Sequence, residues 1–463
     1  MPDSRSHAVD SVEQHLSSGQ LLADLRRRVA YRTVSSEPEC LPQLHAYLAD
    51  EIAPALGRLG CAVEIVENPV RGAGPVLLAR RHEDAALPTV LVYGHADVVA
   101  VEEDAWESGL PPWEVTSRGG RWYGRGTADN KGQHSINVAA IAHVLAARRG
   151  RLGFNLKVLV ETGEEVGSPG LEEICVARRE DLSADVLIAS DGVRCAAGRP
   201  TIFLGSRGEA NFVLRARLRD ASYHSGNWGG VLRNPATVLA SAIDALVDGR
   251  GRIRPERLRP PPLDAEVRAL LADVTIDAGP AAPRPDEGWG EPGLTATERV
   301  LAWNSLEVLS LQAGPPGVPP NAIPGEASAH CQLRFVVGTA MSEVEATVRS
   351  TLDRAGLSMV GIEMGPCTPA TRLEPGDPWV GWARRSMRET TGSEPAVLPN
   401  LGGTLPNHVF SEILGLPTIW IPHSYPACGQ HAANEHLPVS LALDALRIMT
   451  GVFWDLGEAI SRI

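Results

Sequence analysis

The sequence predicts an α/β protein in which a mixed, mostly parallel sheet is flanked by helices and carries an inserted α+β domain. Three observations among its 463 residues indicate this class. Between about residues 20 and 205, short apolar runs alternate with segments of helical periodicity, as in parallel sheets that are covered on both faces. From residue 206 to 368, strands alternate apolar and polar residues, which is typical of an antiparallel sheet with one solvated face. From residue 369 the first pattern resumes.

In the first part, β-branched and apolar runs predict strands, and amphipathic periods predict helices. The expected helices are 20–29, 42–59, 134–149 and 171–179, and the expected strands are 63–66, 76–80, 89–93, 155–161 and 186–189. In sheets of this kind, ligands bind beyond the carboxyl ends of the strands. The residues that directly follow these strands are therefore the first candidates for a functional site.

The middle part follows the order β-α-β-β-α-β, which describes a separate small α+β domain. Its expected strands are 211–219, 306–312, 327–336 and 358–364, its helices are 234–247 and 342–354, and the Pro/Arg-rich stretch 249–262 is a loop or linker. The last part contains expected helices at 379–390, 406–414 and 440–458 and a strand at 418–421. A chain of this length exceeds one ordinary core. We expect one domain made of residues 1–205 and 369–463, with 206–368 inserted.

Composition excludes several classes of protein. The net charge of −13 argues against nucleic acid and anionic membranes as partners. No apolar run approaches the ~20 residues that span a bilayer. The first 20 residues are polar and do not resemble a signal peptide, so we expect a cytoplasmic location. The seven cysteines are scattered without a Cys-x-x-Cys pair, which favours buried thiols over a disulfide framework or a Cys-rich zinc site.

His95 and Asp97 follow the apolar run 90–93 in the segment Gly94-His95-Ala96-Asp97. Residues two apart at the end of a strand point to the same face, because side chains alternate. One of them can therefore bind a metal while the other orients it. Taken alone, a histidine at the end of a strand is more often an ordinary hydrogen-bonded residue.

Further metal- or proton-handling side chains recur in loops downstream. They are Asp129 before an expected helix, Glu164 and Glu165 in a glycine-flanked loop after a strand, Asp191 in Ser-Asp-Gly, and His431 and His436 in the segment 429–436. Each has an ordinary explanation on its own, such as a helix N-cap or a turn residue. Together, two histidines and three carboxylates can hold two divalent ions about 3.5–4 Å apart when one carboxylate is shared. Glu164 is then left over as a base.

This ordered set closely resembles the M20 family of metallopeptidases, the group of aminoacylases, dipeptidases and carboxypeptidase G2-like enzymes. The resemblance extends from about residue 20 to 460. Within the family, segments 219–230, 321–324 and 402–406 look like the carnosinase-type cytosolic dipeptidase branch. The resemblance implies a zinc-peptidase-like catalytic domain, an inserted lid and dimerisation domain, and a homodimer.

The resemblance also implies a role for each residue of the set. His95 and Asp191 would bind one metal ion, Glu165 and His431 would bind the other, and Asp129 would bridge both. Asp97 would orient the His95 imidazole from behind. Glu164 would be the general base that takes a proton from the attacking water. His431 is preferred to His436 because the family places its ligand three residues before Asn-Glu.

His224, Asn321 and Arg334 match substrate-binding positions of the inserted domain, and Thr404 matches a position near the substrate's carboxylate. His224 would supply a donor to the oxyanion across a two-fold dimer interface. The planar fork of Arg334 suits a free carboxylate, although a strand residue on a solvated face is a serious alternative. Asn321 stands where the branch often has Thr, so the sequence leaves the substrate open.

We therefore expect a dinuclear metal hydrolase that cleaves the amide bond of dipeptides or related N-acyl amino acids. The alternative within the family is an N-acyl- or N-carbamoyl-amino-acid amidohydrolase. A non-catalytic binding module is a third reading, and the presence of all six metal and base positions argues against it. The two divalent ions are expected to be zinc, with manganese or cobalt as alternatives.

Overall fold

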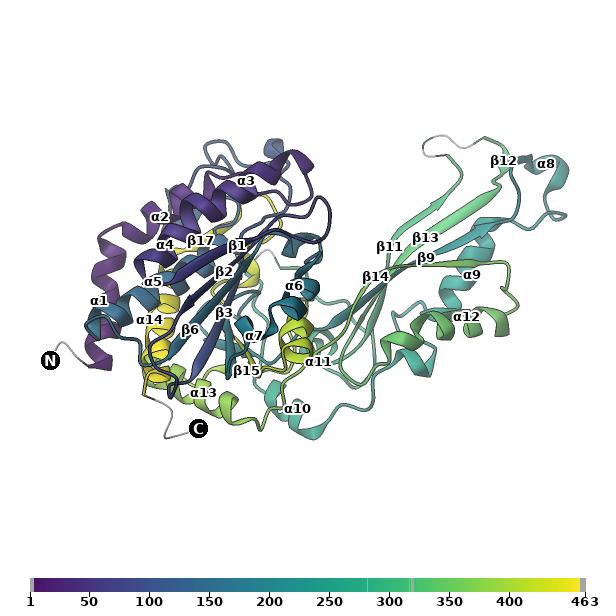
Figure 1. Cartoon of the computed structure of the whole chain (residues 1–463). Helices are drawn as coiled ribbons and strands as arrows, with labels where there is room; N and C mark the ends of the chain where they lie inside the picture. Colours follow the sequence, from purple (N-terminus) through teal and green to yellow (C-terminus); the bar gives the residue numbers. More distant parts are fainter. Residues whose placement is uncertain (1–3, 281, 316, 318–319, 459–463) are drawn as a thin grey trace.

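The computed structural model describes residues 4–280, 282–315, 317 and 320–458. Its largest sheet has eight strands in the order β1-β2-β6-β3-β7-β16-β8-β15 (Figure 1). The strands are β1 (Ala62–Val66), β2 (Val76–Arg81), β3 (Thr89–His95), β6 (Asn155–Glu161), β7 (Val186–Ala189), β8 (Thr201–Phe203), β15 (Ala396–Leu398) and β16 (Thr418–Trp420). The central strands β6, β3, β7 and β16 are parallel, whereas β1 and β2 pair antiparallel at one edge. The predicted fold class is confirmed.

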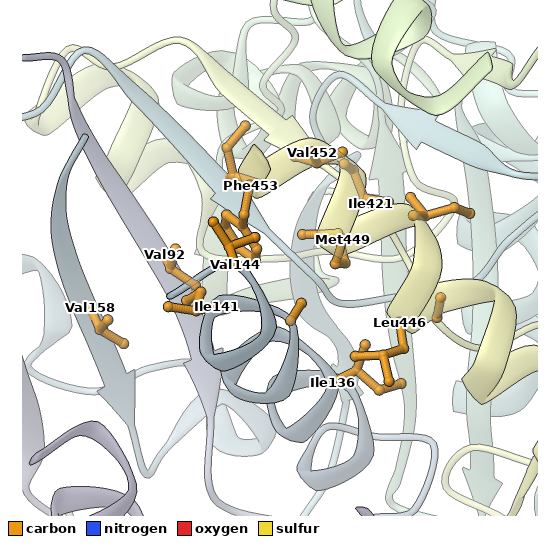
Figure 2. Close-up of a cluster of buried hydrophobic side chains, with 14 of the residues drawn as sticks. Val92, Ile136, Ile141, Val144, Val158, Ile421, Leu446, Met449, Val452 and Phe453 are labelled. Carbon is orange, nitrogen blue, oxygen red and sulfur yellow. The ribbon is translucent and has the colours of Figure 1, made fainter. Parts of the chain in front are cut away.

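Each central strand is apolar on both sides, because helices cover both faces of the sheet. Val92, Val158 and Ile188 face one layer, while their neighbours Leu91, Leu159 and Leu187 face the other. The first layer contains α1 (Arg5–Ser17), α2 (Gln20–Val29), α4 (Ala53–Arg58), α5 (Lys131–Ala147), α13 (Pro378–Thr391) and α14 (Val439–Leu456). Figure 2 shows side chains of α5 and α14 packed against Val92 and Val158. The second layer contains α6 (Leu171–Ala177), α10 (Ala265–Leu271) and α11 (Ala296–Ala302).

The second sheet has four antiparallel strands in the order β11-β13-β9-β14. They are β9 (Gly208–Arg217), β11 (Ser305–Ala313), β13 (Glu326–Phe335) and β14 (Gly361–Thr368). Helices α9 (Pro235–Leu246) and α12 (Val344–Arg354) cover one face, which carries the alternate apolar residues of β9 such as Phe212 and Leu214. The other face carries polar side chains such as Glu209, Asn211 and Arg334. This burial pattern matches the alternation in the sequence.

A short extension lies at the far end of the second sheet, away from the large sheet (Figure 1). It consists of β10 (Tyr223–His224) paired with β12 (Ala322–Ile323), followed by α8 (Ser225–Trp228). We call these residues the tip. Its side chains include the exposed Tyr223 and Trp228.

The middle of the chain contributes to both sheets. Helices α10 and α11, from within 206–368, place Val267, Leu271 and Leu301 in the apolar cluster that contains Tyr93 and Trp420 of the large sheet. The segment between β9 and β11, which contains α10 and α11, therefore completes the second helical layer of the large sheet. The domain limits 1–205, 206–368 and 369–463 stay a prediction.

Several elements differ from the sequence-based expectation. The expected helix 42–59 consists of α3 (Leu41–Ala46), a π-helical stretch at Tyr47–Ile52 and α4. Helix α1 was not expected, although its Ala8, Val9 and Val12 are buried. Also unexpected were β8, β15, α7 (Arg179–Leu182) and a small sheet of β4 (Thr116–Arg118), β5 (Arg121–Tyr123) and β17 (His436–Pro438). Strands of three residues carry too little alternation to be recognised.

All seven cysteines are free, and six are buried as expected. The expectation is wrong for Cys367, which is exposed because it lies on β14 at the edge of the second sheet. Among the described residues, no helix has both the length and the apolar character needed to cross a membrane.

Candidate metal centre

The carboxyl ends of β3, β6 and β7 bring the expected site residues to one edge of the large sheet. His95 is the last residue of β3, the loop with Glu164 and Glu165 follows β6, and Asp191 follows β7. Asp129 lies just before α5. These strands are parallel, so their carboxyl ends meet at the same edge. His431 arrives there from a loop near the end of the chain.

Asp97 connects β3 to the loop after β6. Its Oδ1 lies 3.3 Å from His95 Nδ1, and both side chains are fully buried. The same carboxylate accepts the backbone N–H groups of Glu164 at 3.2 Å and Glu165 at 3.0 Å. Asp97 is thus placed to orient the His95 ring and to hold the two glutamates beside it, as expected for a side chain behind a metal ligand.

The Asp129 carboxylate lies between the two histidines. Its Oδ1 is 3.1 Å from His95 Nε2, and its Oδ2 is 3.2 Å from His431 Nε2. Asp191 Oδ2 is 3.5 Å from His95 Nε2, while Glu165 Oε2 is 3.0 Å from His431 Nε2. The five expected ligands therefore form two adjacent groups that meet at Asp129. The ligand atoms of His95, Asp129 and Glu165 lie within 4.8 Å of one another.

The site has an excess of buried negative charge, which fits a pair of divalent cations. Burial and the neighbouring carboxylates raise the pKa of Glu165 to about 7 and that of Asp191 to about 6. Burial raises the pKa of Glu164 well above its usual range. Asp191 Oδ2 is buried and accepts no hydrogen bond within the described part of the chain. The donor set of imidazole and carboxylate suits zinc and other divalent ions.

The two histidines differ in their surroundings. Burial would lower the pKa of His95, but the nearby carboxylates outweigh it and raise the pKa well above its usual value. Hydrogen bonds with Asp129 and Glu165 raise the pKa of His431 to about 11. The His431 side chain is 56% exposed, whereas that of His95 is fully buried. Solvent therefore reaches the centre from the His431 side.

Glu435 was not expected to take part in the site. Its buried carboxylate accepts backbone N–H groups from Gly126 at 3.0 Å, Ala128 at 2.8 Å and Asp129 at 3.0 Å. It also accepts a hydrogen bond from Arg125 Nη1 at 2.7 Å. Glu435 thus ties the loop that carries His431 to the loop that carries Asp129. The sequence shows only that Glu435 is near His431, because the other loop lies some 300 residues away along the chain.

Arg334 and Thr404 lie together where the second sheet meets the large one. Arg334 Nη1 donates to Thr404 Oγ1 at 2.5 Å and lies 2.9 Å from Glu209 Oε2. Its Nε donates to Gln332 at 2.9 Å. These contacts therefore hold the Arg334 side chain in place, and Glu209 is its counter-ion. Its expected contact with a substrate carboxylate stays a prediction.

The structure brings His224 and Asn321 together, but it does not bring them to the metal centre. The Ser225 N–H donates to the Asn321 carbonyl at 2.9 Å, so the two residues share the tip. His224 is exposed and its Nδ1 accepts the Gly226 N–H at 3.1 Å. The tip lies at the opposite end of the second sheet from the large sheet (Figure 1). Within this chain, His224 is a local cap.

Replacing Glu435 by glutamine should weaken metal binding about 10- to 100-fold, as is typical when a residue that orients a ligand is changed. The glutamine NH₂ group would face backbone donors, which loosens the Asp129 loop. Competition with a chromogenic chelator measures the affinity. Glu298→Gln is the matched control, because Glu298 is also buried, accepts the Thr295 N–H and pairs with Arg268, so these contacts lie in α10 and α11 and not in the Asp129 loop. Equal metal affinity in the two variants would contradict a role for Glu435.

Comparison with known proteins agrees with this geometry. The model of peptidase family M20/M25/M40 matches residues 91–455. The chain is 25% identical to the beta-Ala-His dipeptidase of Rattus norvegicus over 96% of this chain and 94% of the relative. It is 26% identical to the cysteinylglycine-S-conjugate dipeptidase of Corynebacterium striatum over 84% of each.

The fold is also found among solved structures. The crystal structure of human carnosine dipeptidase 1 superimposes with a TM-score of 0.81 at 24% identity, covering 97% of this chain and 99% of that one. The family match and the dipeptidase relatives confirm the predicted resemblance to M20 metallopeptidases, and with it the prediction of a metallopeptidase. Since the family model matches well over half of its length, this chain belongs to peptidase family M20/M25/M40.

Proposed function

We propose that this protein is a dinuclear metal-dependent dipeptidase that hydrolyses the amide bond between the two residues of its substrate. The observation that carries the proposal is the shared Asp129 carboxylate, which has one histidine on each oxygen. His95 and Asp191 would hold one divalent ion, and Glu165 and His431 the other. When bound, two such ions supply an acidified water and a polarised substrate carbonyl. Zinc is the proposed ion.

Glu164 is proposed as the general base. It is buried beside the ligands, and its backbone N–H is held by Asp97, but its side chain is not needed for either group of ligands. A carboxylate in this position can take a proton from the attacking water and pass it to the leaving amine. Asp97 keeps the His95 ring and the glutamate loop in register during that transfer.

The names of the relatives support dipeptides as the substrate class. Two relatives are called beta-Ala-His dipeptidase and cysteinylglycine-S-conjugate dipeptidase, so they differ in side chains but share a dipeptide substrate. A dipeptide has a free carboxylate close to the scissile bond, for which Arg334 and Thr404 are available. N-acyl and N-carbamoyl amino acids share this carboxylate. A cytoplasmic location stays a prediction.

Removing the metal should abolish hydrolysis, because both the water and the carbonyl depend on it. The protein is dialysed against a chelator, and Zn²⁺, Mn²⁺ or Co²⁺ is then added. Hydrolysis of dipeptides, acetylated amino acids and carbamoylated amino acids is measured before and after the addition. Dipeptides should be cleaved fastest. Full activity in protein shown to be metal-free by elemental analysis would refute the proposal, and preference for an acylated or carbamoylated amino acid would make the protein a deacylase.

The two adjacent glutamates should respond differently to substitution. Glu164→Gln should lower kcat by at least ~100-fold, the lower end for loss of a general base, and leave metal content nearly unchanged. Glu165→Gln should lose metal, because its carboxylate lies against His431. Metal content per chain and kcat at saturating metal are measured for both. The reverse pattern would exchange the two assignments.

We also propose that the protein acts as a homodimer in which the partner subunit's His224 completes the metal centre. In its own chain, His224 lies on the exposed tip, where Trp228 is 43% exposed, and Val231 just after the tip is 73% exposed. The edge strand β11 also leaves Leu309 and Leu311 about 60% exposed. Apolar side chains gathered on one part of a surface are typical of protein interfaces. A two-fold arrangement would complete both centres at once.

Mixing two inactive variants tests this arrangement. In a heterodimer of His224→Ala and Glu164→Gln, one centre would carry both defects and the other neither, so activity should reach up to half that of a wild-type dimer. The readout is activity after subunit exchange, with each variant alone as the control. If His224 acts within its own chain, every centre keeps one defect and the mixture stays inactive. That result, or an active monomer, would refute the arrangement.

A further inference from the structure

The strongest feature that the metal centre does not use is a cavity of about 500 Å³ between the second sheet and the segment 251–305. Its lining includes Arg207, Arg334, Trp289, Trp303, Glu307 and Gln332. Pockets of this size commonly hold small molecules, with a few polar groups that fix their orientation. The cavity is lined by Arg334, the residue proposed to bind the substrate's terminal carboxylate, and therefore belongs to the proposed substrate site.

Arg207 is a buried cation in the lining of this cavity. Its side chain is largely enclosed, at 9% exposure for the residue. Its Nε donates to the Gly402 carbonyl at 2.8 Å and its Nη1 to the Trp303 carbonyl at 3.5 Å. No carboxylate of the described residues forms an ion pair with it. Burying a charge without a partner is unfavourable, so such a group fits a site whose partner is a ligand.

The surroundings of Arg207 also favour a negatively charged ligand. Burial and the positive charge of Arg334 lower the pKa of Arg207 to about 10, while the Glu307 carboxylate acts against them. Arg334, by contrast, is paired with Glu209 at 2.9 Å. The two guanidinium groups thus carry two positive charges but share only one paired carboxylate. With Glu209 paired to Arg334, one of the two positive charges, that of Arg207, is left to face a negatively charged group of a ligand.

The cavity and the candidate metal centre are linked through one loop. Gly192 follows Asp191 and packs so tightly against Leu401 that a Cβ on it would lie 2.9 Å from Leu401 Cδ2. The next residue along that loop, Gly402, holds Arg207 through its carbonyl. One loop therefore separates the metal ligand Asp191 from Arg207. Arg334 lines this cavity and is the proposed partner of the substrate's terminal carboxylate, so the C-terminal residue of a dipeptide would lie in this region.

We propose that the cavity recognises an acidic C-terminal residue of the substrate, with Arg334 bound to the α-carboxylate and Arg207 to the side-chain carboxylate. The proposal rests on the proposed dipeptidase function and narrows its substrate class to dipeptides that end in Glu or Asp. Arginine suits the task because its planar fork binds both oxygens of a carboxylate.

The test compares Gly-Glu with Gly-Gln, which have nearly the same shape and differ by one charge. In metal-loaded wild-type protein, kcat/KM for Gly-Glu should exceed that for Gly-Gln at least about tenfold, the factor expected for a charge-assisted hydrogen bond. Arg207→Gln should bring this ratio close to one. Arg215→Gln is the control, because this substitution removes the same charge at a distance. Arg215 lies eight residues beyond Arg207 along β9, about 26 Å away. It should keep the wild-type ratio.

A wild-type ratio of one or less, or an unchanged ratio in Arg207→Gln, would overturn the acidic subsite. Should Arg207→Gln fail to fold, binding of glutamate and glutamine to wild-type protein by calorimetry gives the same comparison. Glutamate should bind at least about tenfold more tightly, and equal affinities would overturn the proposal. Failure of the dipeptidase function itself is distinct, because neither dipeptide would then be cleaved.

Discussion

The structure depends on one carboxylate that two histidines share. Asp129 lies between His95 at the end of β3 and His431 from the far end of the chain, with one oxygen near each ring. None of these side chains alone distinguishes a metal centre from an ordinary polar contact. Two further side chains hold the arrangement: Asp97 binds the glutamate loop and Glu435 binds the backbone of the Asp129 loop. The centre is therefore formed by buried carboxylates that organise backbone N–H groups as well as by the ligands.

Such a concentration of buried acid requires a rigid support. The large sheet supplies it, because its central strands are packed on both faces and cannot shift without disturbing both apolar clusters. Parallel pairing places the ends of β3, β6 and β7 at one edge, so side chains from three distant segments meet there. The position of the site follows from the direction of these strands.

The second sheet differs from the large sheet in its surroundings. One of its faces is polar and open, its tip is far from the large sheet, and its base carries Arg334 beside Thr404. Helices α10 and α11 pack on the large sheet, and α11 also lines the cavity that contains Arg207. The cavity thus lies between the base of the second sheet and a helix that packs on the large sheet. An internal pair such as Arg334 with Glu209 keeps a cation in place without using all of its hydrogen-bond donors.

Local patterns in the sequence determined the class of fold and most of the candidate centre. Period-two and period-3.6 hydrophobicity are local properties, so they identified the central strands, and the residues that follow those strands included His95, Glu165 and Asp191. Strands of three residues, such as β8 and β15, have too few positions for any period. Three other features depend on segments far apart in the chain: the link between Glu435 and Asp129, the surroundings of the Arg207 guanidinium among the described residues, and the distance of His224 from the centre. Only the tertiary structure decided these features, because a hydrogen bond or an absent counter-ion is a property of neighbours in space.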